Sequence, residues 1–455
     1  MRRLSLVLFT CVALVPVWAQ SELEQKIPAR AEEALKESGA PSVSIAVVSD
    51  GKIWARAYGK ANLEQNRAAR VSTRYAVGSI SKQFTAAAIL LLQEQQKISL
   101  DDTVSKYFPD LTRANEITVR ELLSHTSGYE DYAPQDYLIP AWTKPTTPMA
   151  VVDHWAKLPL NFDPGTKWQY SNTNYVIAGL MVEKASGQTL LSFLQDKIFT
   201  PLHMKSAGFC DEKSPADAGA YTRYALGPAR PIEREAPGWY FGAGELCMTA
   251  EDLAKWDMAF LNHQILSPQS YADFTTEVRL KNGDHTNYAL GLDVGQFHGI
   301  PSISHSGEVM GFLASNTLYP NRDTAVAALS NEVGVNMLWP LVDQISSILL
   351  LPSQPPATQA ELQDVRGILE GLQKGKVDAA LFTSDANFYW QSALPDYQSS
   401  LAPLGELKSV LRTGESLRGG MTHRSYRATF EKRSVDLNCY VMPDGKYEQF
   451  LVEGD

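Results

Sequence analysis

The chain has 455 residues, of which 44% are hydrophobic and 20% are charged, and its formal net charge is −10. This composition is ordinary for a folded protein and excludes a disordered chain, while the length favours one large domain with a smaller second one. The acidic balance argues against nucleic acid as a partner, because phosphate backbones bind basic surfaces.

The first nineteen residues have the features of a secretory leader. Arg2 and Arg3 precede an apolar run from Leu4 to Val17, and small residues follow where a signal peptidase would cut. We expect an exported protein, periplasmic or secreted, with no stable membrane span once residues 1–19 are removed. A retained N-terminal anchor is the alternative. Removal takes away two arginines and no acidic residue, which leaves 39 basic against 51 acidic residues and a net charge of −12.

In chain order, the sequence predicts strands at both ends of residues 20–351 and helices between them. Asp50-Gly51 is a dipeptide typical of tight hairpins, and the run from Phe84 to Leu92 is almost wholly apolar, as in a buried helix. The predicted elements are a helix over 22–38, strands over 42–49 and 52–59, a buried helix over 79–96, mostly helices over 101–200, strands over 288–294, 302–305, 312–319 and 325–330, and a helix over 336–351. We therefore expect an α+β catalytic domain over 20–351, with an antiparallel sheet flanked by helices and an all-helical subdomain.

A proline-rich segment predicts a linker over residues 352–359, followed by a small α+β domain over 360–455. Helices are expected to about Ser399, and alternating strands after them. The apolar faces of these strands are Tyr426, Ala428 and Phe430, then Val435, Leu437, Cys439 and Val441. The profile is similar to cystatin-like or NTF2-like accessory domains. The domain could serve as a ligand or partner platform through Arg418, His423, Arg424 and Arg427, although such residues are more often a solvated strand face.

The cysteines and histidines give no metal signature. Cys210, Cys247 and Cys439 remain after the leader, with no CxxC spacing, and the eight histidines form no HExxH motif. Two alternatives remain open: one disulfide between Cys210 and Cys247, or three buried free thiols. No metal and no cofactor is predicted.

The first motif that carries chemistry is Ser79-Ile80-Ser81-Lys82, at the start of the predicted buried helix. Residues three apart on a helix share a face, so the Lys82 amine can reach the Ser79 hydroxyl. Burial disfavours the ammonium form and lowers a lysine pKa, which would make Lys82 a base for a serine nucleophile. An N-cap serine with a surface lysine is the ordinary alternative.

Two further motifs have the residue types of an acyl-transfer site. Tyr170-Ser171-Asn172 precedes a helix predicted to start near Thr173; nearby cations would make the Tyr170 phenolate accessible as a base, and Asn172 could bind an amide or ester group. His305-Ser306-Gly307 is expected at a strand end, where backbone N–H groups could bind an oxyanion. Each motif alone could equally be a core aromatic, a helix cap or a turn.

Together, SxxK, YxN and HSG in this order resemble the serine β-lactamase-like family of class C β-lactamases, DD-peptidases and esterases. The resemblance runs from about residue 24 to 350. It is supported by Leu122-Leu123-Ser124-His125-Thr126-Ser127-Gly128, by Pro201-Leu202-His203-Met204 and by the stretch from Gly242 to Leu253, where Thr249 and Asp252 suggest a capped helix.

The resemblance implies a site of eight residues, in which Ser306 and Gly307 belong to the substrate-binding and oxyanion segment. Ser79 would be the acylated nucleophile, Lys82 its proton acceptor, and Tyr170 the base or proton relay. Asn172 would bind the substrate carbonyl or amide, and His305 would orient Tyr170 or a substrate carboxylate. The oxyanion hole would be formed by the N–H groups of Ser79 and of Glu308, which follows Ser306 and Gly307.

The resemblance implies a serine acyl hydrolase that acts through an acyl-enzyme on peptide, ester or β-lactam bonds, with a small acyl compound or D-amino-acid peptide as substrate. Many relatives have lysine where this chain has His305, and a neutral histidine beside Glu308 weakens the case for an efficient β-lactamase. The alternative is a catalytically weak sensor or binding protein of the same fold. The sequence predicts no particular oligomeric state.

Overall fold

A computed structural model describes residues 17–210, 215–351 and 357–453. The chain divides into two compact units after Leu351. Most of the predicted leader, residues 1–16, and most of the predicted linker, residues 352–356, lie outside the described residues. Within the described residues, no helix is both long enough and apolar enough to cross a membrane.

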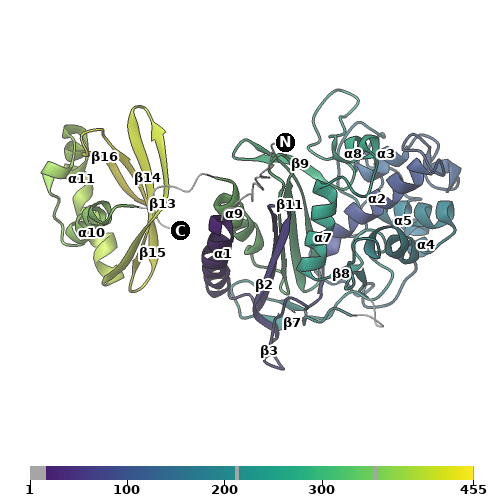
Figure 1. The fold of residues 1–455 in the computed structure, drawn as a ribbon, viewed down its shortest axis with the longest axis horizontal. Helices are drawn as coiled ribbons and strands as arrows, with labels where there is room; N and C mark the ends of the chain where they lie inside the picture. Colours follow the sequence, from purple (N-terminus) through teal and green to yellow (C-terminus); the bar gives the residue numbers. More distant parts are fainter. Residues whose placement is uncertain (1–16, 211–214, 352–356, 454–455) are drawn as a thin grey trace, which may run out of the picture. The chain divides into compact units, whose positions relative to one another are not determined.

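The first unit is built on one seven-stranded antiparallel sheet (Figure 1). The predicted architecture is confirmed: N-terminal strand β1 pairs on one side with β2 and on the other with β12, which lies near the end of the unit. The strand order is β3 (Arg67–Ala68), β2 (Lys52–Asn62), β1 (Ser42–Ser49), β12 (Thr324–Ser330), β11 (Phe312–Tyr319), β10 (Ile300–Val309) and β9 (Asp293–Phe297).

The hairpin between β1 and β2 forms where the sequence predicted it. Asp50 and Gly51 both have positive φ, 51° and 67°, which is the requirement of a type I′ turn, and Ser49 faces Lys52 across it. The same turn fixes the register of the whole pair.

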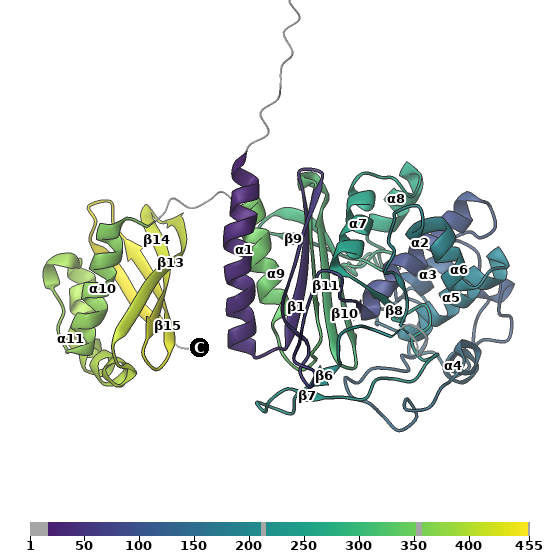
Figure 2. The same cartoon turned by 60° about the horizontal axis from the view of Figure 1, so that its bottom comes forward.

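Helices cover both faces of this sheet (Figure 2). On one face, α1 (Val17–Ser38) and α9 (Leu338–Leu350) pack against each other and bury an apolar cluster that includes Ile27, Val43 and Ile345. On the other face, α7 (Ala250–Leu261) contacts β1, β2 and β12. Its N-cap is Thr249, whose side chain accepts from the backbone N–H of Asp252, as the sequence predicted.

The rest of the unit is a helical region around α2 (Ser81–Glu94), which packs on α5 (Asn172–Ser186). The expectation that residues 101–200 are mostly helical is only partly correct, because prolines interrupt it and turns and loops join short helices. The other helices here are α3 (Val119–Leu123), α4 (Pro148–Trp155), α6 (Leu190–Leu194) and α8 (Pro268–Thr275). Short strands form two further sheets, β4 (Tyr75–Ala76), β8 (Leu246–Met248) and β5 (Gly208–Phe209), and β6 (Tyr221–Thr222) with β7 (Arg230–Pro231).

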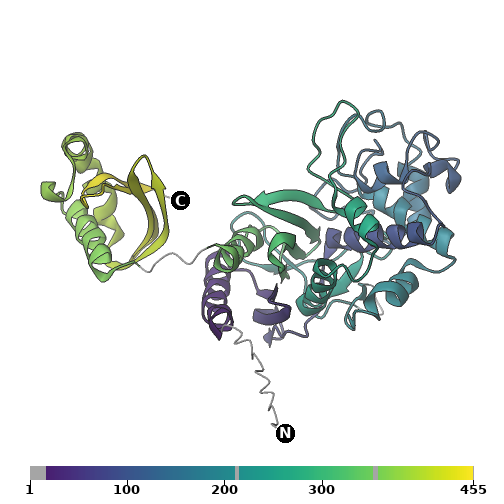
Figure 3. The same ribbon diagram turned by 45° about the horizontal axis from the view of Figure 1, so that its top comes forward.

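The second unit is a four-stranded antiparallel sheet with two helices on one face (Figure 3). Its elements are α10 (Gln359–Gln373), α11 (Ser384–Leu401), β13 (Leu407–Arg418), β14 (Met421–Phe430), β15 (Ser434–Val441) and β16 (Tyr447–Glu453). The seven residues predicted to form its apolar faces are all buried.

The basic residues of the second unit do not form an open patch. Arg424 bonds Glu415 at 2.7 Å, and Arg427 bonds Asp436 at 3.0 Å. Arg418 donates to the Tyr440 hydroxyl at 2.8 Å. These contacts favour the structural interpretation of the residues over a platform for an anionic ligand.

Candidate active site

Ser79 lies in a 3₁₀ turn, Gly78–Ile80, immediately before α2. The sequence predicted the helix from Ser79, and the α-helix itself starts at Ser81. Gly78 has φ 51°, and a Cβ there would lie 2.7 Å from the backbone nitrogen of Glu308. Glycine is therefore required for the turn to pack against strand β10.

Lys82 reaches Ser79 from the first turn of α2. Its side chain is fully buried, and Nζ is 2.9 Å from Ser79 Oγ, 2.8 Å from Asn172 Oδ1 and 2.8 Å from the Ala243 carbonyl oxygen. Burial lowers the Lys82 pKa to about 7, although the nearby Asp131 carboxylate raises it. The predicted contact and the predicted direction of the shift are both present.

These three contacts fix the orientation of the amine. The oxygens of Asn172 and Ala243 can only accept, so two N–H bonds of Lys82 point to them. When the amine is neutral, its lone pair is left facing the Ser79 hydroxyl. This geometry would allow a neutral Lys82 to accept the Ser79 hydroxyl proton.

Asp131 is a site residue that the sequence reasoning missed. Its Oδ1 accepts from the backbone N–H of Asn172 at 3.0 Å and from Asn172 Nδ2 at 3.2 Å. These bonds orient the amide so that its oxygen faces Lys82. No motif marks Asp131; it lies only three residues after Gly128 of the HTSG segment.

Tyr170 lies beside Ser79 but has the opposite electrostatic character from the one expected. Burial raises its pKa well above the usual range, and a hydrogen bond from Ser79 offsets this only in part. The Lys82 amine lies 4.8 Å from the ring centroid. The expected phenolate is therefore not favoured, because desolvation, with added repulsion from Asp131 and Asp293, raises the Tyr170 pKa and keeps the phenol neutral.

His125 forms the packing surface behind Tyr170, with the ring centroids 4.3 Å apart. It is fully buried, and its Nδ1 accepts from the Ser171 backbone N–H at 3.2 Å. Its Nε2 has no hydrogen-bond partner among the described residues. Burial lowers its pKa well below the usual range. The sequence motif pointed to this residue without indicating its position under the tyrosine.

His305 lies within β10, rather than at a strand end as predicted, because the strand continues to Val309. Its Nδ1 contacts the Ser306 carbonyl oxygen, so Nδ1 carries the proton and Nε2 accepts from Tyr288 Oη at 2.8 Å. Burial lowers its pKa to about 3.

The expected role of His305 is changed by these contacts. Both ring nitrogens are occupied and its ring centroid is 6.2 Å from that of Tyr170. His305 therefore holds Tyr288, another residue the sequence reasoning missed, and is a neutral group in the site.

The strand β10 lies against the turn that carries Ser79. A Cβ on Gly307 would lie 2.0 Å from the Val77 carbonyl oxygen, so only glycine permits this approach. The contact places the backbone of Gly307 and Glu308 beside Gly78 and Ser79. This is the arrangement needed for the predicted oxyanion hole.

A cavity of about 680 Å³ opens over these residues. Six of the eight predicted site residues line it, and Lys82 reaches it through Ser79 from below. The predicted residues in its lining are Ser79, Tyr170, Asn172, His305, Ser306 and Glu308. The lining also includes Asp131, Asp136 and Asp293, which together with Glu308 make the cavity acidic.

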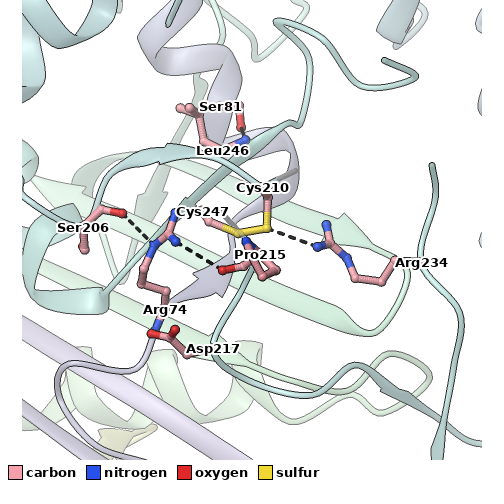
Figure 4. Close-up of a disulfide and its surroundings, with 9 residues drawn as sticks. All are labelled: Arg74, Ser81, Ser206, Cys210, Pro215, Asp217, Arg234, Leu246 and Cys247. Carbon is pink, nitrogen blue, oxygen red and sulfur yellow. Dashed lines mark hydrogen bonds between the residues drawn. A yellow bond between two sulfur atoms is a disulfide. The ribbon is translucent and has the colours of Figure 1, made fainter. Parts of the chain in front are cut away.

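A disulfide lies next to the strand that contacts Ser81 of the SxxK segment (Figure 4). Cys210 and Cys247 are bonded and Cys439 is free and buried, which decides between the two alternatives that the sequence left open. Cys247 lies in β8, paired with Ala76 of β4. The neighbouring Leu246 donates its N–H to Ser81 Oγ at 3.1 Å, so the bridged strand is joined directly to the SxxK segment.

Comparisons with known proteins agree with this geometry. A family model described as Beta-lactamase matches residues 27–343. Penicillin-binding protein 4* of Bacillus subtilis (strain 168) is 28% identical over 303 residues, which cover 62% of this chain and 65% of that protein, less than two thirds of its length.

Two solved structures are also similar. The D-stereospecific amidohydrolase from Streptomyces sp. is 26% identical, with a TM-score of 0.61 and coverage of 71% of this chain and 98% of that one. The D-amino acid amidase from Ochrobactrum anthropi SV3, complexed with L-phenylalanine amide, is 21% identical, with a TM-score of 0.63 and coverage of 72% and 96%. The second likeness shows the fold.

Proposed function

This chain belongs to the β-lactamase family, and from that premise we propose that it is a serine acyl hydrolase that forms a covalent acyl-enzyme on Ser79. The observation that carries the proposal is the environment of Lys82. The amine is buried, has a lowered pKa, and has two N–H bonds committed to Asn172 and Ala243 while its third position faces Ser79 Oγ at 2.9 Å. A hydroxyl with such a base is an activated nucleophile.

Acylation then proceeds in the cavity over Ser79. Neutral Lys82 takes the hydroxyl proton while Oγ attacks the substrate carbonyl carbon. The N–H groups of Ser79 and Glu308 bind the oxyanion, and this kind of stabilisation usually accounts for most of the rate gain in acyl transfer. The ammonium formed at Lys82 is stabilised by Asn172 Oδ1 and the Ala243 carbonyl.

Tyr170 completes the proton path. Because its phenol is neutral, it can donate to the departing nitrogen or oxygen and regain a proton by way of Lys82. The carbonyl–leaving group bond breaks and the acyl group stays on Ser79. A water that gives its proton to the same pair then attacks the ester and releases the acid.

Among the bonds that members of the family attack, the site supports amides, peptides and esters better than β-lactams. A β-lactam presents a carboxylate, and the place of the lysine that many relatives use is taken by a neutral His305. The similarity to the D-stereospecific amidohydrolase from Streptomyces sp. fits this preference. We propose export from the cell, which the leader-like N-terminus and the Cys210–Cys247 bridge support, because disulfides persist in oxidising compartments.

A fluorophosphonate probe tests the proposal. We expect one adduct on Ser79 by mass spectrometry, its loss in Ser79→Ala, and its retention in Ser81→Ala, a matched change in the same segment. Folded protein with no adduct on Ser79 would refute it. Stoichiometric acylation by substrate without product release would instead indicate a sensor or binding protein.

A further inference from the structure

Resting on the proposed function, we propose that the substrate carries a protonated amine next to an aromatic or apolar group. The amine would bind where Glu308 and Asp136 border the cavity over Ser79. The apolar group would enter a second cavity beyond them. The proposal thus names the substrate class of the site and a subsite for it.

The second cavity continues the first. It has a volume of about 800 Å³, and Asp136 and Glu308 line both cavities. Its other lining residues are largely apolar and aromatic: Tyr137, Leu138, Ile232, Leu313, Val335 and Trp339. Tyr137 is 66% exposed and Trp339 43% exposed, which is unusual for such large rings and leaves them free to contact a ligand.

The charge of this cleft is one-sided. Asp131, Asp136, Asp293 and Glu308 line the first cavity, and no ion pair of Asp136, Asp293 or Glu308 with a basic side chain occurs in the part of the chain that the structure describes. The cation nearest Ser79 is Lys82, which is buried beneath it and readily loses its charge.

Arg223 lines the second cavity but does not balance these acids. Its guanidinium bonds both carboxylate oxygens of the buried Glu332, at 2.7 and 3.0 Å. A two-bond pair of this kind occupies one edge of the guanidinium and pairs its charge with the Glu332 carboxylate. With Arg223 paired in this way, Glu308 and Asp136 are the charged residues in the lining of the second cavity that a ligand can pair with.

Burial disfavours the charged form of two carboxylates of the first cavity, those of Glu308 and Asp293. Partial burial raises the pKa of Glu308 to about 7, with added repulsion from Asp136 and Glu235, and burial raises that of Asp293 to about 6. An ammonium group between Glu308 and Asp136 would relieve this repulsion, whereas a substrate carboxylate would increase it.

Matched substrates test the proposal. The 4-nitrophenyl esters of 3-amino-, 3-hydroxy- and 3-carboxy-4-phenylbutanoic acid carry an amine, a hydroxyl or a carboxylate between the reacting carbonyl and the phenyl ring, so they have similar size and differ in charge. At pH 7.5 and low salt, we expect kcat/KM for the amine to exceed that for the alcohol by about tenfold, with the carboxylate lowest. High salt should reduce the difference.

Variants locate the effect. Glu308→Gln and Asp136→Asn should each lower the amine-to-alcohol ratio at least about threefold, and Glu233→Gln, an exposed acid outside both cavities, should leave it unchanged. The ratio is taken within each variant, so changes in overall rate cancel. Equal rates for the three esters, or a ratio unaffected by Glu308→Gln, would overturn the inference and leave the acyl hydrolase intact.

A binding experiment separates the two proposals if no ester is hydrolysed. Benzylamine, benzyl alcohol and benzoate are titrated into Ser79→Ala protein. Tighter binding of benzylamine that depends on Glu308 would support the amine subsite even if wild-type Ser79 gave no covalent adduct. Equal or weaker binding of benzylamine would reject the subsite.

Discussion

Asn172 links Lys82 to Asp131: its Oδ1 accepts from Lys82 Nζ at 2.8 Å, and its Nδ2 donates to Asp131 Oδ1 at 3.2 Å. Reversing the amide would place its NH₂ group against Lys82 and its oxygen against the carboxylate. Asp131 thus selects the amide orientation that leaves the Lys82 lone pair for Ser79. Asp131 thus orients Lys82 through Asn172, and it can do so without contacting the bond of the substrate that reacts.

The Lys82 pKa predicts the pH dependence of turnover. Because the base must be neutral, kcat/KM for a neutral ester should rise with pH, with a midpoint near 7, and level off above it. The buried neighbours His125 and His305 are held neutral by burial and by Lys82, so they do not account for this limb. A rate that falls between pH 6 and 8 would contradict the assignment.

Asp131→Asn should move that midpoint downward. Asp131 is the charge that raises the Lys82 pKa against the larger effect of burial, so its removal favours the neutral amine at lower pH. We expect a lower kcat because Asn172 loses its partner, and a midpoint below that of wild type. A lower kcat with an unchanged midpoint would make Asp131 merely structural.

Tyr170→Phe should preserve the fold and reduce amide turnover by about 100-fold or more, because the proton donor to the departing nitrogen is lost. The wild-type rate should show no descending limb up to pH 10, since burial raises the phenol pKa well above its usual range. A stopped-flow comparison of acylation by an activated ester should show a smaller loss. Equal losses for amide and ester would argue against leaving-group protonation.

Breaking the disulfide should destabilise the catalytic unit. Cys210 and Cys247 are 37 residues apart, and chain-entropy estimates for a loop of this size give about 4 kcal/mol. Denaturant unfolding of the Cys210→Ser/Cys247→Ser protein measures the loss. Cys439→Ser, which removes a free thiol in the second unit, is the control and should leave unfolding of the first unit unchanged.

Asp257 predicts a decline of stability with pH. It is fully buried in α7, burial raises its pKa to about 8, and its Oδ1 accepts from Asn316 Nδ2 at 2.8 Å. The unfolded carboxyl ionises at about pH 4, so the folded state binds one more proton between about pH 4 and about pH 8. Its contribution to the free energy of unfolding should fall by up to about 1.4 kcal/mol per pH unit across that range.

Asp257→Asn tests this pair. Asp257 Oδ2 and Asn316 Oδ1 have no other partner among the described residues, and an asparagine could donate to Asn316 where only a protonated acid can now. We expect the variant to be the more stable protein at pH 8 and to lose this part of the pH slope. A slope identical to that of wild type would show that Asp257 is ionised in the folded protein.

The central fold could be predicted because its elements have local signals. Two β-rich runs joined by Asp50-Gly51 located β1 and β2, and the apolar run after Ser79 located α2. The structure of residues 101–200 could not be predicted in this way, because its loops are held by tertiary contacts such as the hydrogen bond from the Asn161 N–H to the Gly128 carbonyl oxygen. The local pattern of residue types along the sequence does not predict such tertiary contacts.

The sequence predicted which residues form the site better than it predicted their pKa values and protonation states. The residues of three spaced motifs come together: Ser79, Tyr170 and His305 line one cavity, and Lys82 contacts Ser79 from beneath it. The sequence could not show that burial raises the Tyr170 pKa, or that His305 is engaged by Tyr288. These depend on how much water each group loses, which follows from packing by residues distant in the chain.

The pairing of β1 with β12 has a consequence for biosynthesis. Val43 faces Ser330, so the middle of the sheet joins one of the first strands translated to one of the last of this unit. Until β12 has left the ribosome, one edge of β1 has no hydrogen-bonded partner. The pair of β10 and β11, which packs against the turn that carries Ser79, is then not yet joined to β1. A chain truncated before residue 324 would therefore lack a finished catalytic centre and present an unpaired strand to aggregation and proteolysis.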